Sequence, residues 1–84
     1  MIRLLLVEDD ANLSYIIQGG LEDMIGGYEV TIAPNGKEGL ETYRQMKPDI
    51  IVADIEMPVM DGYEMVRRIR ETDEEIPILF SSAR

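Results

Sequence analysis

Apolar residues along the chain fall into two alternating kinds of segment. Short runs rich in leucine, isoleucine and valine occupy residues 2–7, 28–33, 49–54 and 76–82, and such runs are typical of strands that are buried on both faces. Between these runs, apolar residues recur three or four positions apart, which predicts helices with one packed face. The alternation of strand and helix predicts an α/β fold, a doubly wound parallel sheet with right-handed crossovers.

The first predicted helix carries one apolar stripe but contains weak points. Gly19 and Gly20 interrupt it, and each glycine is less favourable in a helix than alanine by about 1 kcal/mol. Gly26 and Gly27 are suited to ending the helix, because glycine readily adopts the left-handed conformation found after many helices. The stripe consists of Leu13, Ile16, Ile17, Leu21 and Met24.

The second and third predicted helices have recognisable ends. Asn35 is a good N-cap for the second helix, and Pro48 ends it. The third helix is expected to begin near Asp61, where an Asp-Gly pair also signals a turn. The inward positions are expected to be Leu40 and Tyr43 in the second helix, and Val66 and Ile69 in the third.

Composition excludes several classes of function. The chain has 84 residues, with 17 Asp and Glu against 8 Lys and Arg, so its net charge of −9 disfavours direct binding to nucleic acid. Cysteine and histidine are absent, which excludes disulfides, thiolate or histidine catalysis and zinc sites built from these residues. No apolar run approaches the roughly 20 residues that span a bilayer, and the start of the chain does not resemble a signal peptide.

Acidic residues follow two of the predicted strands directly. Glu8 and Asp9 come after the first strand, and Asp54 ends the third. If these strands are neighbours, their carboxyl ends bring the three carboxylates into one crevice, where ligands of open α/β sheets bind. Such carboxylates repel one another, and a hard cation such as Mg²⁺ relieves the repulsion. The alternative is that these acids only cap the first helix, which is the role expected of Asp10.

A hydroxyl and a turn complete this end of the predicted sheet. Ser82 falls at the carboxyl end of the fourth strand, where it could donate to an anion bound over Asp54, although a serine at a strand end is often only a turn residue. Asp61 and Gly62 are expected to serve local structure, as a helix cap and a turn.

Four segments are similar to successive signatures of the receiver domain of two-component response regulators: LLLVEDD, APNGKEGL, KPDIIVADIEMPVMDG and IPILFSSA. The resemblance extends over nearly the whole chain and implies a flavodoxin-like sheet with strand order 2-1-3-4. It also implies an aspartyl-phosphate switch in which Asp54 is the phosphoacceptor. Asp9, Asp54 and the backbone carbonyl of Glu56 would bind Mg²⁺ directly, and Glu8 would reach it through water. Ser82 would be the switch hydroxyl that closes on the phosphoryl group.

The chain also departs from the family pattern. Receiver domains ordinarily have five strands and five helices, so the resemblance implies that residues 1–84 are an incomplete domain without helix four, strand five and helix five. The lysine and the aromatic switch residue of the missing region are absent with them. Lys37 and Lys47 flank the second helix and cannot replace that lysine, and Arg84 is a conceivable substitute. The acidic side chain of Glu56 could alter metal affinity or the lifetime of the phosphoryl group.

The resemblance thus implies a cytoplasmic signalling switch rather than an enzyme, with at most slow self-dephosphorylation. Its partners would be a sensor histidine kinase and an output domain or protein, often DNA-binding in the family, that this chain does not encode. Two alternatives remain open: a Mg²⁺-dependent phosphohydrolase with Glu56 as a partial match to its general acid, and a fragment that does no chemistry. Because the fourth strand and the face of the first helix would be uncovered, we expect the chain to form a dimer or otherwise associate.

Overall fold

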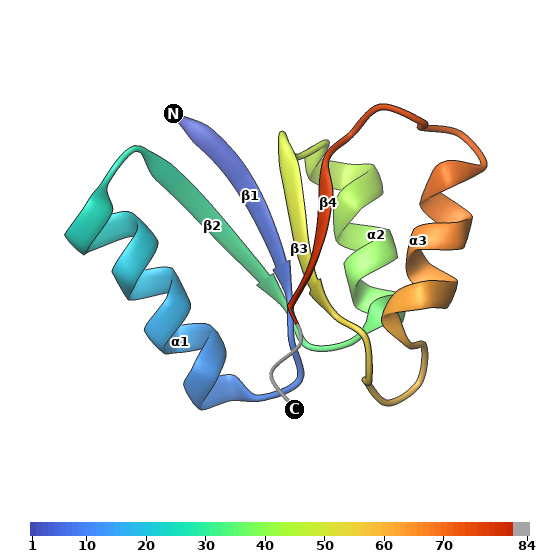
Figure 1. Ribbon diagram of the computed structural model, residues 1–84, viewed down its shortest axis with the longest axis horizontal. Helices are drawn as coiled ribbons and strands as arrows, with labels where there is room; N and C mark the ends of the chain where they lie inside the picture. Colours follow the sequence, from blue (N-terminus) through green and yellow to red (C-terminus); the bar gives the residue numbers. More distant parts are fainter. Residues whose placement is uncertain (82–84) are drawn as a thin grey trace.

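The computed structural model describes residues 1–81 and contains one parallel sheet of four strands in the order β2-β1-β3-β4. The predicted strand order is therefore confirmed, and Ser82 and Arg84 lie outside the described residues. The elements, shown in Figure 1, are β1 (Ile2–Val7), α1 (Ala11–Gly19), η1 (Gly20–Ile25), β2 (Tyr28–Ala33), α2 (Gly36–Met46), β3 (Ile50–Asp54), α3 (Gly62–Arg70) and β4 (Ile78–Ser81).

The register of the sheet aligns the ends of the strands. Val7, the last residue of β1, pairs with Ala33 at the end of β2 and with Ala53 in β3. Asp54, one residue further along β3, pairs with Ser81 of β4. The loops that leave β1 and β3 therefore start side by side at one edge of the sheet.

The three α-helices begin at the residues that the sequence indicates. The side chain of Asp10 accepts a hydrogen bond from the backbone N–H of Leu13, and Asn35 and Asp61 cap α2 and α3 in the same way. At the other end, α2 closes with Lys47 in the left-handed conformation, just before Pro48. These caps satisfy N–H groups that the first turn of a helix leaves without intrahelical partners.

The glycine pair in the first helix changes its winding rather than ending it. α1 continues at Gly20 into η1, a π-helix, which stops at Gly26 with φ +83°. Side chains on both sides of this change hold β2, because Gln18 Nε2 donates to the carbonyl of Val30 and Glu22 accepts from its N–H. The free edge of β2 is thus partly covered by its own preceding helix.

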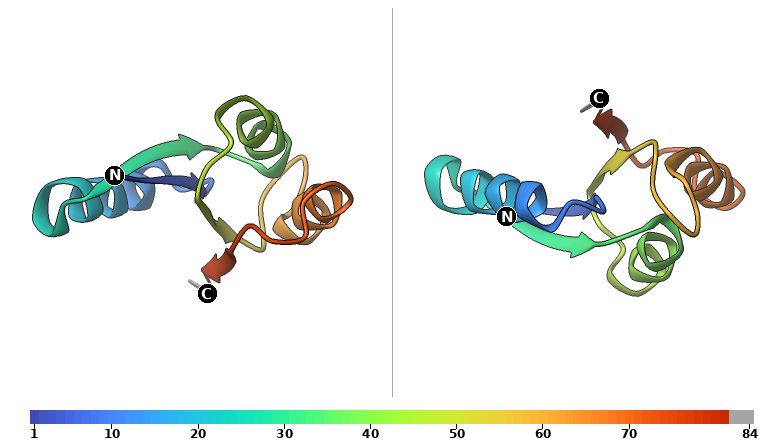
Figure 2. Two further views of the ribbon diagram at one scale, coloured as in Figure 1. Left: turned by 90° about the horizontal axis from the view of Figure 1, so that it is seen from above. Right: turned by 90° about the horizontal axis from the view of Figure 1, so that it is seen from below.

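Each face of the sheet has its own apolar core. Leu4 and Leu6 pack with Val30, Ile17 and Leu21, whereas Leu5 and Val7 pack with residues of α2 and α3. These two helices lie on the opposite side of the sheet from α1 (Figure 2). The inward stripe of α3 is wider than predicted: Ile69 is fully buried and the half-buried Val66 packs against the same core, as expected, but Met65 is fully buried as well. Met65 and Val66 lie four and three positions before Ile69, on neighbouring parts of one helical face.

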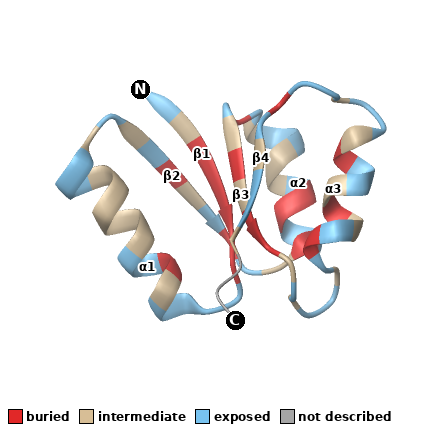
Figure 3. Cartoon of the chain, in the orientation of Figure 1, coloured by how far each residue is buried: buried red, intermediate tan, exposed pale blue. Residues whose placement is uncertain are grey.

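Coverage of the two faces is unequal. α2 and α3 cover one face, whereas α1 and η1 lie over the β2 side of the other (Figures 1 and 2). Leu79 and Phe80 in β4 are exposed, as the burial colouring of Figure 3 shows for this strand. Within residues 1–81, β4 is an edge strand with exposed apolar side chains.

Candidate functional site

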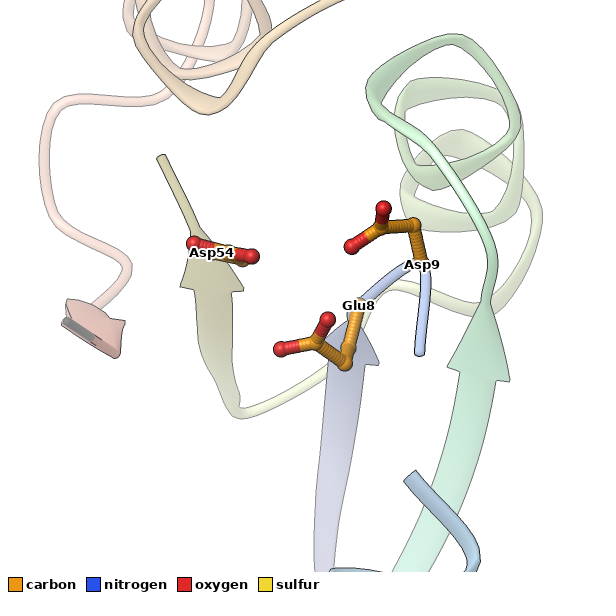
Figure 4. A group of neighbouring side chains, drawn as sticks. All are labelled: Glu8, Asp9 and Asp54. Carbon is orange, nitrogen blue, oxygen red and sulfur yellow. The ribbon is translucent and has the colours of Figure 1, made fainter. Parts of the chain in front are cut away.

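Three carboxylates meet at the carboxyl edge of the sheet. Glu8 and Asp9 follow β1, Asp54 ends β3, and one carboxylate oxygen from each lies within 4.8 Å of the other two (Figure 4). The figure shows the three side chains directed toward a common space between the two strand ends. The prediction that adjacent strands bring these residues together is confirmed.

Burial distinguishes the three acids. Glu8 and Asp54 are 3% and 4% exposed, whereas Asp9 is exposed. Burial raises the pKa of the Glu8 carboxyl above its usual value; the N–H of Asp10, which donates to Glu8 at 3.0 Å, opposes this rise. A hydrogen bond with Asp9 and the charge of Asp54 raise the pKa of Glu8 further.

Asp54 has an unsatisfied acceptor. Its Oδ2 atom is buried and accepts no hydrogen bond within the described part of the chain. Leaving a buried charged acceptor unpaired is unfavourable, so such an atom in a native protein calls for a ligand. Together with two further carboxylates, it forms an all-oxygen donor set of the kind that Mg²⁺ prefers. The residues present therefore fit a hard divalent cation.

The loop from β3 to α3 forms one wall of the site. It lines a cavity of about 550 Å³ together with Asp9, and its contributions include Glu56, Met57 and Asp61. The side chain of Glu56 is exposed. Glu8 and Asp54 do not line this cavity; both are buried beside it.

Close backbone contacts hold this loop in place. The N–H of Gly36, the first residue of α2, donates to the carbonyl of Met60 at 2.9 Å, and the N–H of Gly62 donates to Ile55 at 2.8 Å. A Cβ at Gly36 would lie 2.3 Å from the oxygen of Met60, and one at Gly62 would lie 2.4 Å from the carbonyl oxygen of Asp54. Only glycine permits these approaches.

The sequence predicts only part of this local structure. Asp61 is the expected cap of α3, but Gly62 does more than form a turn, since it lets α3 start against the backbone of Asp54. Gly36 was missed. The Asn-Gly pair at its position signals a helix start, and nothing local in the sequence reveals its contact with Met60.

The fourth strand brings its end to the same edge. Ser81 pairs with Asp54 in the sheet, so the chain leaves β4 beside the carboxylates. The predicted switch hydroxyl, Ser82, is the next residue and lies outside the described residues, as does Arg84. Among residues 1–81, no helix is long and apolar enough to cross a membrane.

The chain is similar in sequence to known regulatory proteins. The chain is 39% identical over 83 residues to the transcriptional regulatory protein TrcR of Mycobacterium tuberculosis, covering 99% of this chain and 32% of that protein. It is 40% identical over 84 residues to the transcriptional regulatory protein AfsQ1 of Streptomyces coelicolor, covering 100% of this chain and 36% of the relative. The chain thus spans about a third of the length of these curated relatives.

Solved structures show the same fold. The chemotaxis protein CheY4 of Vibrio cholerae superposes with a TM-score of 0.87 at 32% identity, covering 99% of this chain and 72% of that one. The N-terminal domain of a response regulator receiver protein from Methanoculleus marisnigri gives a TM-score of 0.90 at 32% identity, covering 100% and 68%. Residues 4–84 match the family model described as the response regulator receiver domain. With its parallel 2-1-3-4 sheet, the chain belongs to the response regulator receiver domain family.

Proposed function

We propose that Asp54 accepts a phosphoryl group and that the chain acts as a phosphorylation-dependent signalling switch. The observation that carries the proposal is the buried, unsatisfied Oδ2 of Asp54 within a cluster of three carboxylates. An aspartate placed only for structure would have its oxygens hydrogen-bonded or solvated. Here the carboxylate lies at the carboxyl end of a parallel strand, the usual ligand edge of such sheets.

The neighbouring residues would hold the metal that this reaction needs. Asp9, Asp54 and the backbone carbonyl of Glu56 are the proposed direct ligands of Mg²⁺, and Glu8 is the proposed ligand through water. When bound, Mg²⁺ would neutralise negative charge on the incoming phosphoryl group. Glu8 and Asp9 add negative charge that attracts the cation, and the N–H of Asp10 fixes the Glu8 carboxylate from the side.

The role of Asp54 is nucleophilic. A carboxylate oxygen of Asp54 attacks the phosphorus of the donor, the bond from phosphorus to the donor nitrogen or oxygen breaks, and an acyl phosphate forms on the aspartate. The new group adds negative charge and acceptor oxygens at the carboxyl edge of the sheet. The hydroxyl of Ser82 is proposed to donate a hydrogen bond to this group. That bond would couple phosphorylation to a conformational change at the end of β4.

The proposed partners follow from this role. A sensor histidine kinase in the cytoplasm would supply the phosphoryl group, and an output domain or separate protein outside these 84 residues would read the change. The net charge of −9 makes direct contact with nucleic acid by this chain unfavourable. That residues 1–84 form an incomplete receiver domain remains a prediction.

The test is phosphorylation by a small donor, acetyl phosphate, in the presence of Mg²⁺. Mass spectrometry should show one added phosphoryl group on the wild type and none on Asp54→Ala, whereas Asp23→Ala should retain it because Asp23 is an exposed acid on η1 that takes no part in the site. Undiminished labelling of Asp54→Ala would refute the assignment. Release of phosphate over many turnovers would identify a phosphohydrolase instead of a switch.

A further inference from the structure

The loop from β3 to α3 contains a strained residue at its centre. Val59 has φ +71°, and the N–H of Met60 donates to the carbonyl of Pro58 at 2.8 Å across it. A hydrogen bond between residues two apart, with a central φ of about +75°, characterises the rare and strained form of the γ-turn. A β-branched residue in this conformation is an outlier.

The other positive φ among the non-glycine residues 1–81 has an ordinary explanation. Lys47 has φ +47° and closes α2, where its N–H donates to the carbonyl of Tyr43. A left-handed residue is common at that position of a helix. Val59 ends no helix, so its conformation must be imposed by its surroundings.

Two backbone contacts impose it. The bond from Gly36 to Met60 holds the loop just after Val59, and the bond from Gly62 to Ile55 ties the loop closed at its base. The side chain of Val59 gains little in return, because it is 78% exposed. No burial of this side chain offsets the strain, so the strain lowers the free energy needed to open the loop.

Opening is relevant because the acceptor is almost fully buried. Asp54 is 4% exposed and its Oδ2 is buried, so outward movement of the loop that follows it would widen a donor's access to its carboxylate. The loop that carries Val59 lines the adjacent cavity together with Asp9.

We propose that Val59 is a positioning residue: its strained turn keeps the wall of the Asp54 site ready to open and so admits the phosphoryl donor. The part of this inference that concerns the donor rests on the proposed function. The part that concerns the loop does not.

Amide hydrogen exchange tests the loop directly. The N–H groups of Gly36, Met60 and Gly62 each donate to a loop carbonyl and therefore report its opening. In Val59→Asn, asparagine is less strained at a positive φ than the β-branched valine, so exchange at these three amides should slow by about 5- to 30-fold, equal to about 1–2 kcal/mol. Exchange at Gly39, which donates to Asn35 within α2, should not change.

Lys47→Asn is the matched control, because it relieves a positive φ away from the site. It should leave the three loop amides unchanged. Unchanged exchange at those amides in Val59→Asn, or equal slowing at Gly39, would overturn the inference, since the effect would then be absent or merely global.

Phosphorylation by acetyl phosphate tests the consequence for the site. Val59→Asn should acquire the phosphoryl group several-fold more slowly than the wild type at saturating Mg²⁺, while Lys47→Asn keeps the wild-type rate. Slower exchange with an unchanged rate would overturn the link to the donor. A wild type that takes up no phosphoryl group would overturn the proposed function and that link together, and the exchange experiment would still decide whether Val59 loosens the loop.

Discussion

At the scale of single residues, two adjacent aspartates have different roles. Asp9 contributes an oxygen to the carboxylate cluster, whereas the next residue, Asp10, caps α1 through the N–H of Leu13. We therefore expect Asp9→Asn to weaken Mg²⁺ binding by at least about tenfold, because a charged ligand is lost. Asp10→Asn removes the same charge but keeps a capping side chain, so it should change affinity little. NMR titration of both variants measures this, and equal losses would show a general charge effect instead of ligation.

Glycines also differ according to what surrounds them. A Cβ at Gly36 would meet the carbonyl of Met60 at 2.3 Å, whereas one at Gly19 would have nothing within 4 Å. Gly36→Ala should lower the free energy of unfolding by about 1–3 kcal/mol, as for overpacked sites. Gly19→Ala should raise it by about 0.5–1 kcal/mol, because alanine is the better helix former. Urea unfolding measures both changes. A Gly36→Ala variant as stable as the wild type would contradict the packing around Gly36, and a destabilised Gly19→Ala would contradict the open surroundings of Gly19.

At the scale of elements, the sequence indicated whatever depends on local pattern. Strand runs and helix caps such as Asn35 were predictable, because apolar periodicity and capping act over a few residues. The strand order of the sheet was implied only by the resemblance to the receiver family, and the sheet has that order. The π-helix η1, the burial of Met65 and the turn at Val59 were not. Each of these depends on contacts between segments distant in sequence, such as Gln18 with Val30.

The candidate site likewise combines features that local sequence pattern predicts with features that depend on long-range packing. Its three acids were predictable, since they follow apolar strand runs directly and the crossover connections bring those strand ends to one edge. The burial of Glu8 and Asp54 and the enclosing loop were not, because they depend on the packing of α2 and α3 against that edge.

Tyr43 links two elements and gives a pH-dependent prediction. Its hydroxyl donates to Asp73 at 2.8 Å and so fastens α2 to the segment that follows α3. This bond, with two backbone N–H groups, lowers the pKa of Asp73 from its usual 3.8. A lowered carboxyl pKa stabilises the fold above the unfolded value, and the stabilisation is lost as the pH falls through the folded value. Tyr43→Phe should therefore reduce Tm at pH 7, by an amount that shrinks at acid pH.

Tyr15→Phe serves as the control for this measurement, because Tyr15 is 76% exposed and lies on α1, away from Asp73. Thermal unfolding of both variants from pH 7 down to about pH 2 should separate them. A Tm difference for Tyr43→Phe that stays constant over this range would mean that Asp73 does not carry the effect.

At the scale of the whole molecule, the two edges of the sheet differ. Gln18 and Glu22 cover the N–H and carbonyl of Val30 on the outer strand β2. Within the described residues, β4 has no neighbour on its outer side, and its Leu79 and Phe80 are 57% and 38% exposed. An uncovered apolar edge strand is a ready surface for pairing with another chain.

The 84-residue chain on its own should therefore associate. Leaving a large apolar side chain in water forfeits about 1.5–3 kcal/mol, and Ile16 on α1, 68% exposed, adds to the exposed residues of β4. A few such losses are a large share of the stability of a small domain. Sedimentation at micromolar concentration should give a dimer or larger species, and Leu79→Lys should shift it toward monomer, because a lysine on an edge strand opposes pairing. Glu29→Lys on β2 is the matched control and should not dissociate it. A compact, cooperatively unfolding wild-type monomer would show that the uncovered edge of β4 is tolerated in water.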